Sequence, residues 1–181
     1  MITSSAVSHG LVRVPMTWER YRAESPTPSE YYDGAMVVMN SPTRRHQQIV
    51  QRLERVLEVS LPAGTAMTAG WGWSPADVEE ELIPDVMVHS ETTDDATFTG
   101  IPLLVVEVLS SNRRDDLVAR FNRYAAWGAR DYWIVDPRDK VLLTFRSESG
   151  IFSESGRHTD GRVNLSYADI RVELDLDDLW A

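Results

Sequence analysis

The sequence contains no cysteine. This absence excludes disulfide bonds, zinc sites built on thiolates and catalysis by a thiol nucleophile, and it fits a reducing compartment, so we expect a cytoplasmic protein. No apolar run approaches the roughly 18 residues of a membrane-spanning helix, so no membrane association is expected. The first residues also lack the apolar block of a secretory signal.

Positive charge is scarce as well. The chain has 18 basic and 28 acidic residues and a formal net charge of −10. An overall negative field does not attract nucleic acid, so binding to nucleic acid would need a local basic surface. Among the basic residues only Lys140 is a lysine. A role that calls for a positive side chain therefore falls to arginine.

The 181 residues suffice for one compact domain. We expect residues 15–181 to form a single domain and residues 1–14 to be a flexible N-terminus. The apolar share of 43% and the charged share of 25% are ordinary for a globular protein.

Four stretches favour helices. Residues 43–60 place apolar side chains on one helical face, and Pro62 and Gly64 end the pattern. Residues 115–127 predict a second helix, with an N-cap near Asp115 and Gly128 beyond its end. A short helix is expected within residues 15–25, and another closes the chain.

Valine-rich apolar runs predict a sheet. Residues 82–89, 103–109 and 132–135 are expected to be central strands, and the stretch 30–40 is expected to be a hairpin that turns at Asp33-Gly34. A single helical crossover joins the second and third of these strands, which indicates a parallel pair within a mixed α/β sheet. The C-terminal residues 162–180 are expected to form one strand and the closing helix.

Two acids stand within these apolar runs, Asp85 and Glu107. A glutamate is almost never fully buried unless it is paired or bound. If the two strands are neighbours, the carboxylates can converge, and they then need a proton or a cation. Mg²⁺ or Mn²⁺ with oxygen ligands would meet that need. The alternative is that the acids lie at a strand end and face water or an arginine.

Several segments together carry a resemblance to a known family: "EYYDG", "NSPTRRHQQIV", "IPDVMV", "LLVVEVLSS" and "DDLVARFNRYAAWGARDYWIVDP". They resemble the Uma family of predicted restriction endonucleases, within the PD-(D/E)xK nuclease superfamily. The resemblance implies a restriction-endonuclease-like α/β fold, a mixed β-sheet flanked by helices. It also implies hydrolysis of DNA phosphodiester bonds with a divalent metal, for which Asp85 and Glu107 would be the ligands.

The chain departs from this pattern at one position. The superfamily has a lysine two residues after the glutamate, where this sequence has Leu109. The family tends to carry a lysine on the following helix, four residues before a tyrosine, and counting back from Tyr124 gives Arg120. Arginine can stabilise negative charge but cannot act as a general base. Two interpretations stay open: Arg120 replaces the lysine electrostatically, or the site has lost its activity.

Further residues could support this site. Glu30 and His46 match positions where the family often has an acid and a histidine; each could equally be a surface residue. Arg113, Arg114 and Arg123 could bind phosphate next to the site, or could form a solvated helix face paired with acids.

The sequence therefore predicts a Mg²⁺- or Mn²⁺-dependent endonuclease that cleaves DNA. The resemblance and the aromatic residues Trp127, Trp133 and Trp180 also suggest a homodimer, because they exceed what a small core readily buries. One alternative is a catalytically impaired nuclease-fold module that acts through protein or nucleic-acid contacts. Another is a glycosidase that uses the two acids as acid and base.

Overall fold

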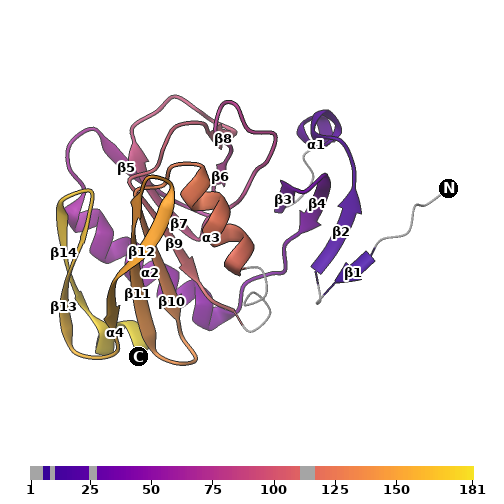
Figure 1. Cartoon of the computed structure of the whole chain (residues 1–181). Helices are drawn as coiled ribbons and strands as arrows, with labels where there is room; N and C mark the ends of the chain where they lie inside the picture. Colours follow the sequence, from indigo (N-terminus) through magenta and orange to yellow (C-terminus); the bar gives the residue numbers. More distant parts are fainter. Residues whose placement is uncertain (1–5, 9–10, 25–27, 111–116) are drawn as a thin grey trace.

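The structure is a computed structural model, and it describes residues 6–8, 11–24, 28–110 and 117–181. A central six-stranded sheet has one long helix on each face, and a smaller N-terminal sheet stands to one side of it (Figure 1). This arrangement confirms the predicted α/β class with a mixed sheet flanked by helices. Within the described ranges, no helix is long and apolar enough to cross a membrane.

The central sheet has the strand order β12-β11-β10-β9-β7-β5. Strands β9 and β10 run parallel, and every other neighbouring pair is antiparallel. The predicted crossover is present, because α3 connects the two parallel strands. The bounds are β5 Thr65–Ala69, β7 Val86–Ser90, β9 Leu104–Val108, α3 Leu117–Ala126, β10 Asp131–Asp136, β11 Val141–Glu148 and β12 Ile151–His158.

The two faces of this sheet bury two separate apolar clusters. On one face lies α2, Arg44–Ser60, which contributes Ile49, Leu53 and Leu57. The hairpin β13 (Arg162–Tyr167) and β14 (Ile170–Asp175) and the closing helix α4 (Leu176–Trp180) complete that cluster. On the other face lies α3, whose Tyr124 and Ala125 pack against β9 and β10.

The N-terminal sheet has the strand order β1-β2-β4-β3 and carries the helix α1, Trp18–Glu24. Its bounds are β1 Ala6–Ser8, β2 Leu11–Pro15, β3 Ser29–Tyr32 and β4 Ala35–Val38. The predicted hairpin is confirmed, since Asp33 and Gly34 both have positive φ (52° and 69°), as a two-residue hairpin turn requires. A β-bridge between Tyr31 and Glu81 joins this sheet to the rest of the molecule.

Some predicted boundaries differ from the structure. Residues 11–14 were expected to be part of a flexible N-terminus, but they belong to β2, which pairs with β4. The strand expected over 82–89 begins only at Val86, because Pro84 has no N–H to continue the ladder. Leu82 instead bridges to Trp73 in the short pair β6 (Gly72–Trp73) and β8 (Thr97–Phe98).

The C-terminal half holds more strands than expected. Strand β12 was not predicted, and residues 162–175 form two strands where one was expected. The turn between β13 and β14 uses Ala168 and Asp169, both with positive φ (43° and 67°). Because neither residue is glycine, the usual signal of a tight turn is absent from the sequence.

The tryptophans expected at an exposed aromatic surface lie mostly inside. Trp133 is 1% exposed and Trp180 is 9% exposed. Trp127 is partly buried and packs edge-on against Trp73, with ring centroids 5.2 Å apart. The two apolar clusters therefore accommodate more aromatic volume than the length of the chain suggested.

Candidate active site

Asp85 stands immediately before β7, where the backbone ladder with β9 stops. The register pairs Val86 with Val106, and its continuation places Asp85 opposite Glu107 and Pro84 opposite Val108. The two predicted metal ligands therefore occupy neighbouring positions at the end of two adjacent strands. The side-chain contacts lead from Asp85 to α2 and from Glu107 to α3.

The Pro-Asp pair has a local structural reason. Val108 N–H points toward β7, but Pro84 and the end of the strand leave it without a backbone partner there. The Asp85 carboxylate accepts this N–H instead, with Val108 N 2.7 Å from Asp85 Oδ2. Buried backbone donors require a partner, so this bond holds the aspartate against β9.

Glu107 is buried, with a residue exposure of 2%, and its partners explain how a strand interior tolerates it. Its Oε1 accepts hydrogen bonds from Arg120 Nη1 at 2.9 Å and from Tyr124 Oη at 2.7 Å. Both donors come from α3, one helical turn apart. The guanidinium supplies the positive charge that a buried carboxylate needs.

Arg120 contacts a second carboxylate at the same time. Its Nη2 donates to Glu30 Oε2, and Glu30 itself is 1% exposed. The other oxygen of Glu30 accepts the N–H of Ile83 at 2.8 Å. Glu30, Glu107, Arg120 and Tyr124 thus form one buried polar cluster that joins β3, β9 and α3. We call it the carboxylate–arginine cluster.

The position of the usual superfamily lysine is filled differently. Leu109 packs against the apolar cluster on the α3 face and carries no charge. Arg120 reaches Glu107 from the helix, as the count from Tyr124 suggested. A positive side chain is therefore beside the strand acid, although it is an arginine and comes from another element.

His46 lies beside Asp85. It sits in the first turn of α2 and is 8% exposed, and its Nε2 is 3.0 Å from Asp85 Oδ2. Asp85 Oδ2 therefore lies between a backbone N–H and an imidazole. The structure brings Asp85 together with His46 and brings Glu107 together with Glu30, Arg120 and Tyr124.

Tyr124 had no assigned role in the sequence and served only as a reference for counting. Burial raises its pKa well above the usual value of 10, and the negative charge of Glu107 acts in the same direction. The hydroxyl therefore stays protonated near neutral pH and donates to Glu107. Its i+4 spacing from Arg120 was the available signal, because residues four apart share one face of a helix.

The arginines expected to bind phosphate have different placements. Arg123 Nε pairs with Glu80 at 3.0 Å, and its Nη2 pairs with Asp33. Its guanidinium lies over the Tyr32 ring, 4.8 Å from the ring centroid. Burial acts to lower the pKa of Arg123, but the two acids outweigh it and the pKa is raised. Arg113 and Arg114, like the expected N-cap at Asp115, lie outside the described residues.

The donor set at the strand ends fits a hard divalent cation. In the described ranges, no three His, Asp or Glu side chains gather closely enough to hold a metal by themselves. Mg²⁺ usually binds through only one or two carboxylates and keeps several waters. Asp85 and Glu107 are oxygen donors from adjacent strands, so they match this minimal set.

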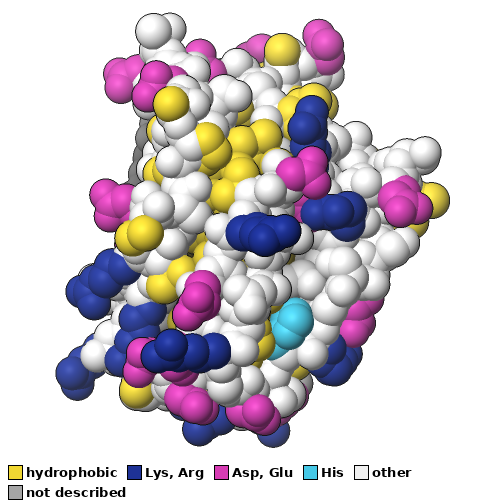
Figure 2. Space-filling model, turned by 90° about the vertical axis from the view of Figure 1, so that its left-hand side faces the viewer, with side chains coloured by type: hydrophobic (Ala, Val, Ile, Leu, Met, Phe, Trp, Pro, Cys, Tyr) yellow, Lys and Arg dark blue, Asp and Glu magenta, His cyan; other side chains and the backbone are white. Residues whose placement is uncertain are grey.

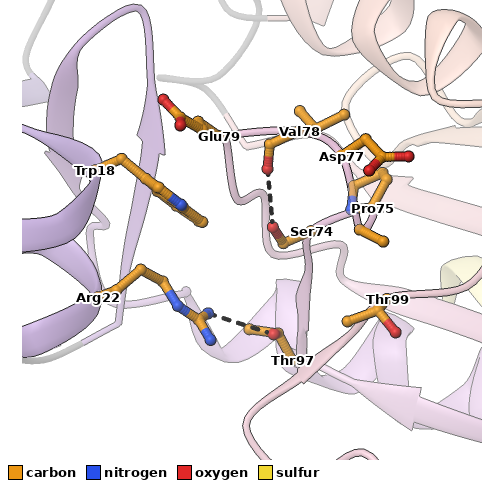
Figure 3. A pocket seen from close by; sticks show the side chains of 10 residues that line it. Trp18, Arg22, Ser74, Pro75, Asp77, Val78, Glu79, Thr97 and Thr99 are labelled. Carbon is orange, nitrogen blue, oxygen red and sulfur yellow. Dashed lines mark hydrogen bonds between the residues drawn. The ribbon is translucent and has the colours of Figure 1, made fainter.

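Other surfaces fit a phosphate backbone less well. On the face shown in Figure 2, acidic and basic side chains alternate, and the described part of it offers no broad basic area. A pocket of about 430 Å³ opens between α1 and the 74–79 loop, where Trp18 points toward the loop and Arg22 donates a hydrogen bond to Thr97 (Figure 3). Asp77 and Glu79 line it and would repel phosphate, and no member of the carboxylate–arginine cluster is part of its wall.

Comparison with known proteins identifies a solved structure with the same fold and a family to which the chain belongs. Among solved structures, the chain is similar to "a putative nuclease belonging to DUF820 from Anabaena variabilis ATCC 29413". The TM-score is 0.73 at 17% sequence identity, over 92% of this chain and 98% of that chain, and this likeness shows a shared fold. No curated protein matches the sequence. The model of the Uma2 family, described as "Putative restriction endonuclease", matches residues 17–177, and the chain therefore belongs to that family.

Proposed function

We propose that this protein is a metal-dependent endonuclease that hydrolyses DNA phosphodiester bonds. The observation that carries the proposal is the position of Asp85 opposite Glu107 at the end of two adjacent strands, with Arg120 bonded to Glu107. Membership of the Uma2 family adds the expectation of nuclease chemistry. Mg²⁺ or Mn²⁺ would be held by the two carboxylates.

A divalent ion in such a site supplies an activated water and neutralises charge on the phosphate. The residues of the chain contribute orientation and charge. The Val108 N–H and His46 Nε2 fix the Asp85 carboxylate, and Tyr124 and Arg120 fix the Glu107 carboxylate. A rigid pair of ligands lowers the cost of ordering the site when the ion and the DNA bind.

Arg120 has an electrostatic role in this proposal. Its guanidinium stays protonated and cannot take a proton from the attacking water. It can stabilise the negative charge that develops on the phosphate, as donors placed in advance do in other enzymes. The loss of the superfamily lysine is therefore compatible with cleavage, provided that the metal alone activates the water.

The test is a cleavage assay on supercoiled plasmid and on linear duplex DNA, with Mg²⁺, with Mn²⁺ and with a chelator. The wild-type protein should nick or cut DNA only in the presence of a metal. Asp85→Asn and Glu107→Gln should each abolish cleavage, whereas Asp77→Asn, in the separate pocket, should leave it unchanged. Cleavage that survives in either of the first two variants would contradict the proposal.

A second candidate function follows from the same cluster. Arg120 bonds to the buried carboxylates of both Glu30 and Glu107 and offsets one of their two negative charges, so the need of these acids for a metal cation is reduced. This favours a catalytically impaired nuclease-fold module that binds DNA or a protein without cutting. Retained DNA binding in gel-shift assays, with no cleavage by the wild type or by Arg120→Lys, would establish this alternative.

A further inference from the structure

We infer that His46 is a positioning residue that fixes Asp85 for metal binding through a hydrogen bond to Asp85 Oδ2. The inference rests on the proposed function, because it assigns His46 a role toward the metal that Asp85 and Glu107 would hold. The site would then also include a residue of α2, the helix on the face of the central sheet opposite α3.

The place of His46 follows from how α2 begins. Thr43 is the N-cap of α2, and its side chain accepts the backbone N–H of His46 at 3.2 Å. This bond is the standard N-cap contact, and it fixes the backbone of the first turn. Ile49 and Leu53 then anchor the same helix in the core. The imidazole is thus carried by a rigid element and not by a loop.

The imidazole contacts the Asp85 carboxylate directly and shares its Oδ2 with a backbone N–H of β9. Asp85 lies just outside β7, so the backbone ladder does not fix the residue on its own. Val108 N and His46 Nε2 both approach the same oxygen, Oδ2, at 2.7 Å and 3.0 Å. Two donors from different directions determine the orientation of a carboxylate far better than one donor does.

The other ring nitrogen of His46 indicates that the residue is not a simple core histidine. Nδ1 is buried and has no hydrogen-bond partner among the described residues. Buried polar atoms are normally satisfied, and an unsatisfied one destabilises the folded state. The unsatisfied Nδ1 makes His46 unfavourable for the stability of the fold. Its presence is explained if the hydrogen bond from Nε2 to Asp85 serves the metal site.

His89 shows the contrast within the same chain. It is 2% exposed, and both of its ring nitrogens have partners: Nε2 lies 3.3 Å from Thr68 Oγ1, and Nδ1 lies 2.8 Å from Ser90 O. His89 therefore behaves as a satisfied core residue. It offers a matched control, because its removal also deletes a buried imidazole but does not touch Asp85.

The experiment measures Mn²⁺ binding by isothermal titration calorimetry on the full chain without DNA. The variants are His46→Leu, His46→Gln and His89→Leu, each first checked for a cooperative unfolding transition. Loss of a hydrogen-bond partner behind a metal ligand typically lowers metal affinity by about 10–100-fold. We expect a loss of that size in His46→Leu and none in His89→Leu. His46→Gln should stay close to wild type, because the glutamine amide can donate from the place of Nε2.

A second measurement does not involve the metal. In metal-free protein, His46→Leu should lose more stability relative to His46→Gln in urea when residue 85 is aspartate than when it is asparagine, because the neutral amide oxygen of asparagine is a weaker acceptor than the carboxylate. This double-mutant comparison isolates the contact between the two side chains. An unchanged difference in the Asp85→Asn background would overturn the inferred contact.

The binding measurements distinguish a failure of the positioning role of His46 from a failure of the metal site itself. If wild-type protein binds Mn²⁺ through Asp85 and Glu107, but His46→Leu binds it equally well, the role of His46 is overturned and the metal site stands. If folded His46→Gln binds as weakly as His46→Leu, the hydrogen-bond account is overturned. If the wild type binds no Mn²⁺, or if binding persists in Asp85→Asn and Glu107→Gln, the proposed metal site fails, and the inference fails with it.

Discussion

Arg120 Nη1 donates a hydrogen bond to Glu107 Oε1 at 2.9 Å, and the two side chains are only 4% and 3% exposed. The charged group on the helix and the charged group on the strand therefore meet away from water. Pairs of this kind are costly to break on one side, because the remaining charge stays buried.

Removal of the arginine charge should destabilise the protein strongly. Arg120→Met leaves Glu30 and Glu107 buried without their cation, and we expect a loss of about 3–5 kcal/mol in the free energy of unfolding. Urea denaturation followed by tryptophan fluorescence measures it. Arg123→Met is the control on the same helix: its partners Asp33 and Glu80 are 62% and 24% exposed and keep contact with water when the arginine is removed, so the loss should be clearly smaller than for Arg120→Met. Equal losses in the two variants would contradict the buried cluster.

Arg120→Lys tests the two interpretations of the missing lysine. Lysine keeps the charge and restores the residue type that the family tends to carry on this helix, so DNA cleavage with Mg²⁺ or Mn²⁺ should be equal to or greater than that of the wild type. Plasmid nicking under identical conditions measures it. If neither protein cuts DNA while Asp85 and Glu107 still bind metal, the nuclease proposal is wrong and the binding-module alternative remains.

Tyr124→Phe removes one donor to Glu107 and leaves the ring in place. Hydrogen bonds to charged groups contribute about 1.5–3 kcal/mol, and we expect a loss of stability in that range. The same change in a Glu107→Gln background should cost less, because the acceptor is no longer charged. Urea unfolding of the four proteins measures both effects. Full additivity of the two changes would show that the Oη–Oε1 contact at 2.7 Å contributes nothing.

The pH dependence of stability should carry a contribution from Glu81. Burial raises its pKa above the usual 4.5, although hydrogen bonding by Tyr21 and the charge of Arg22 act in the opposite direction. In the window just above pH 4.5 the folded state keeps a proton that the unfolded chain has released, so stability falls as pH rises through this window. Glu81→Gln cannot titrate, so its stability relative to wild type should rise with pH there. Parallel urea midpoints for the two proteins across the window would refute this.

The homodimer stays a prediction. A nuclease that cuts both strands benefits from two-fold symmetry. The aromatic residues that first suggested a dimer are largely buried in the core, so they no longer support it. Light scattering at micromolar concentration should give twice the chain mass of 20.5 kDa. A mass equal to one chain would count against the dimer.

Local sequence signals predicted the elements that carry the site. The valine-rich run placed Glu107 on a central strand, and the resemblance to the Uma family, counted back from Tyr124, identified Arg120 on the following helix. Both signals are short-range, and the structure contains both elements. The Asp33-Gly34 turn was predicted for the same reason, because its residues are the ones that a tight hairpin requires.

The contacts between distant segments could not be predicted in this way. Glu30 and Arg120 are far apart in the chain, and only the folded arrangement of β3 against α3 brings them together. From the two acids alone, Glu107→Gln is expected to cost little stability, because the substitution relieves the repulsion between the carboxylates. The structure changes that expectation, since Glu107 accepts hydrogen bonds from Arg120 and Tyr124, and their loss should destabilise the protein.

The contacts of Arg120 with both Glu30 and Glu107 affect how the protein unfolds locally. Glu30 belongs to the N-terminal sheet, whereas Glu107 belongs to the central sheet. The N-terminal sheet therefore cannot separate without taking a carboxylate away from a buried guanidinium. Partial unfolding is disfavoured in proportion to that cost, so the amides of β3 and β9 should exchange with solvent in one cooperative event and not as two independent units.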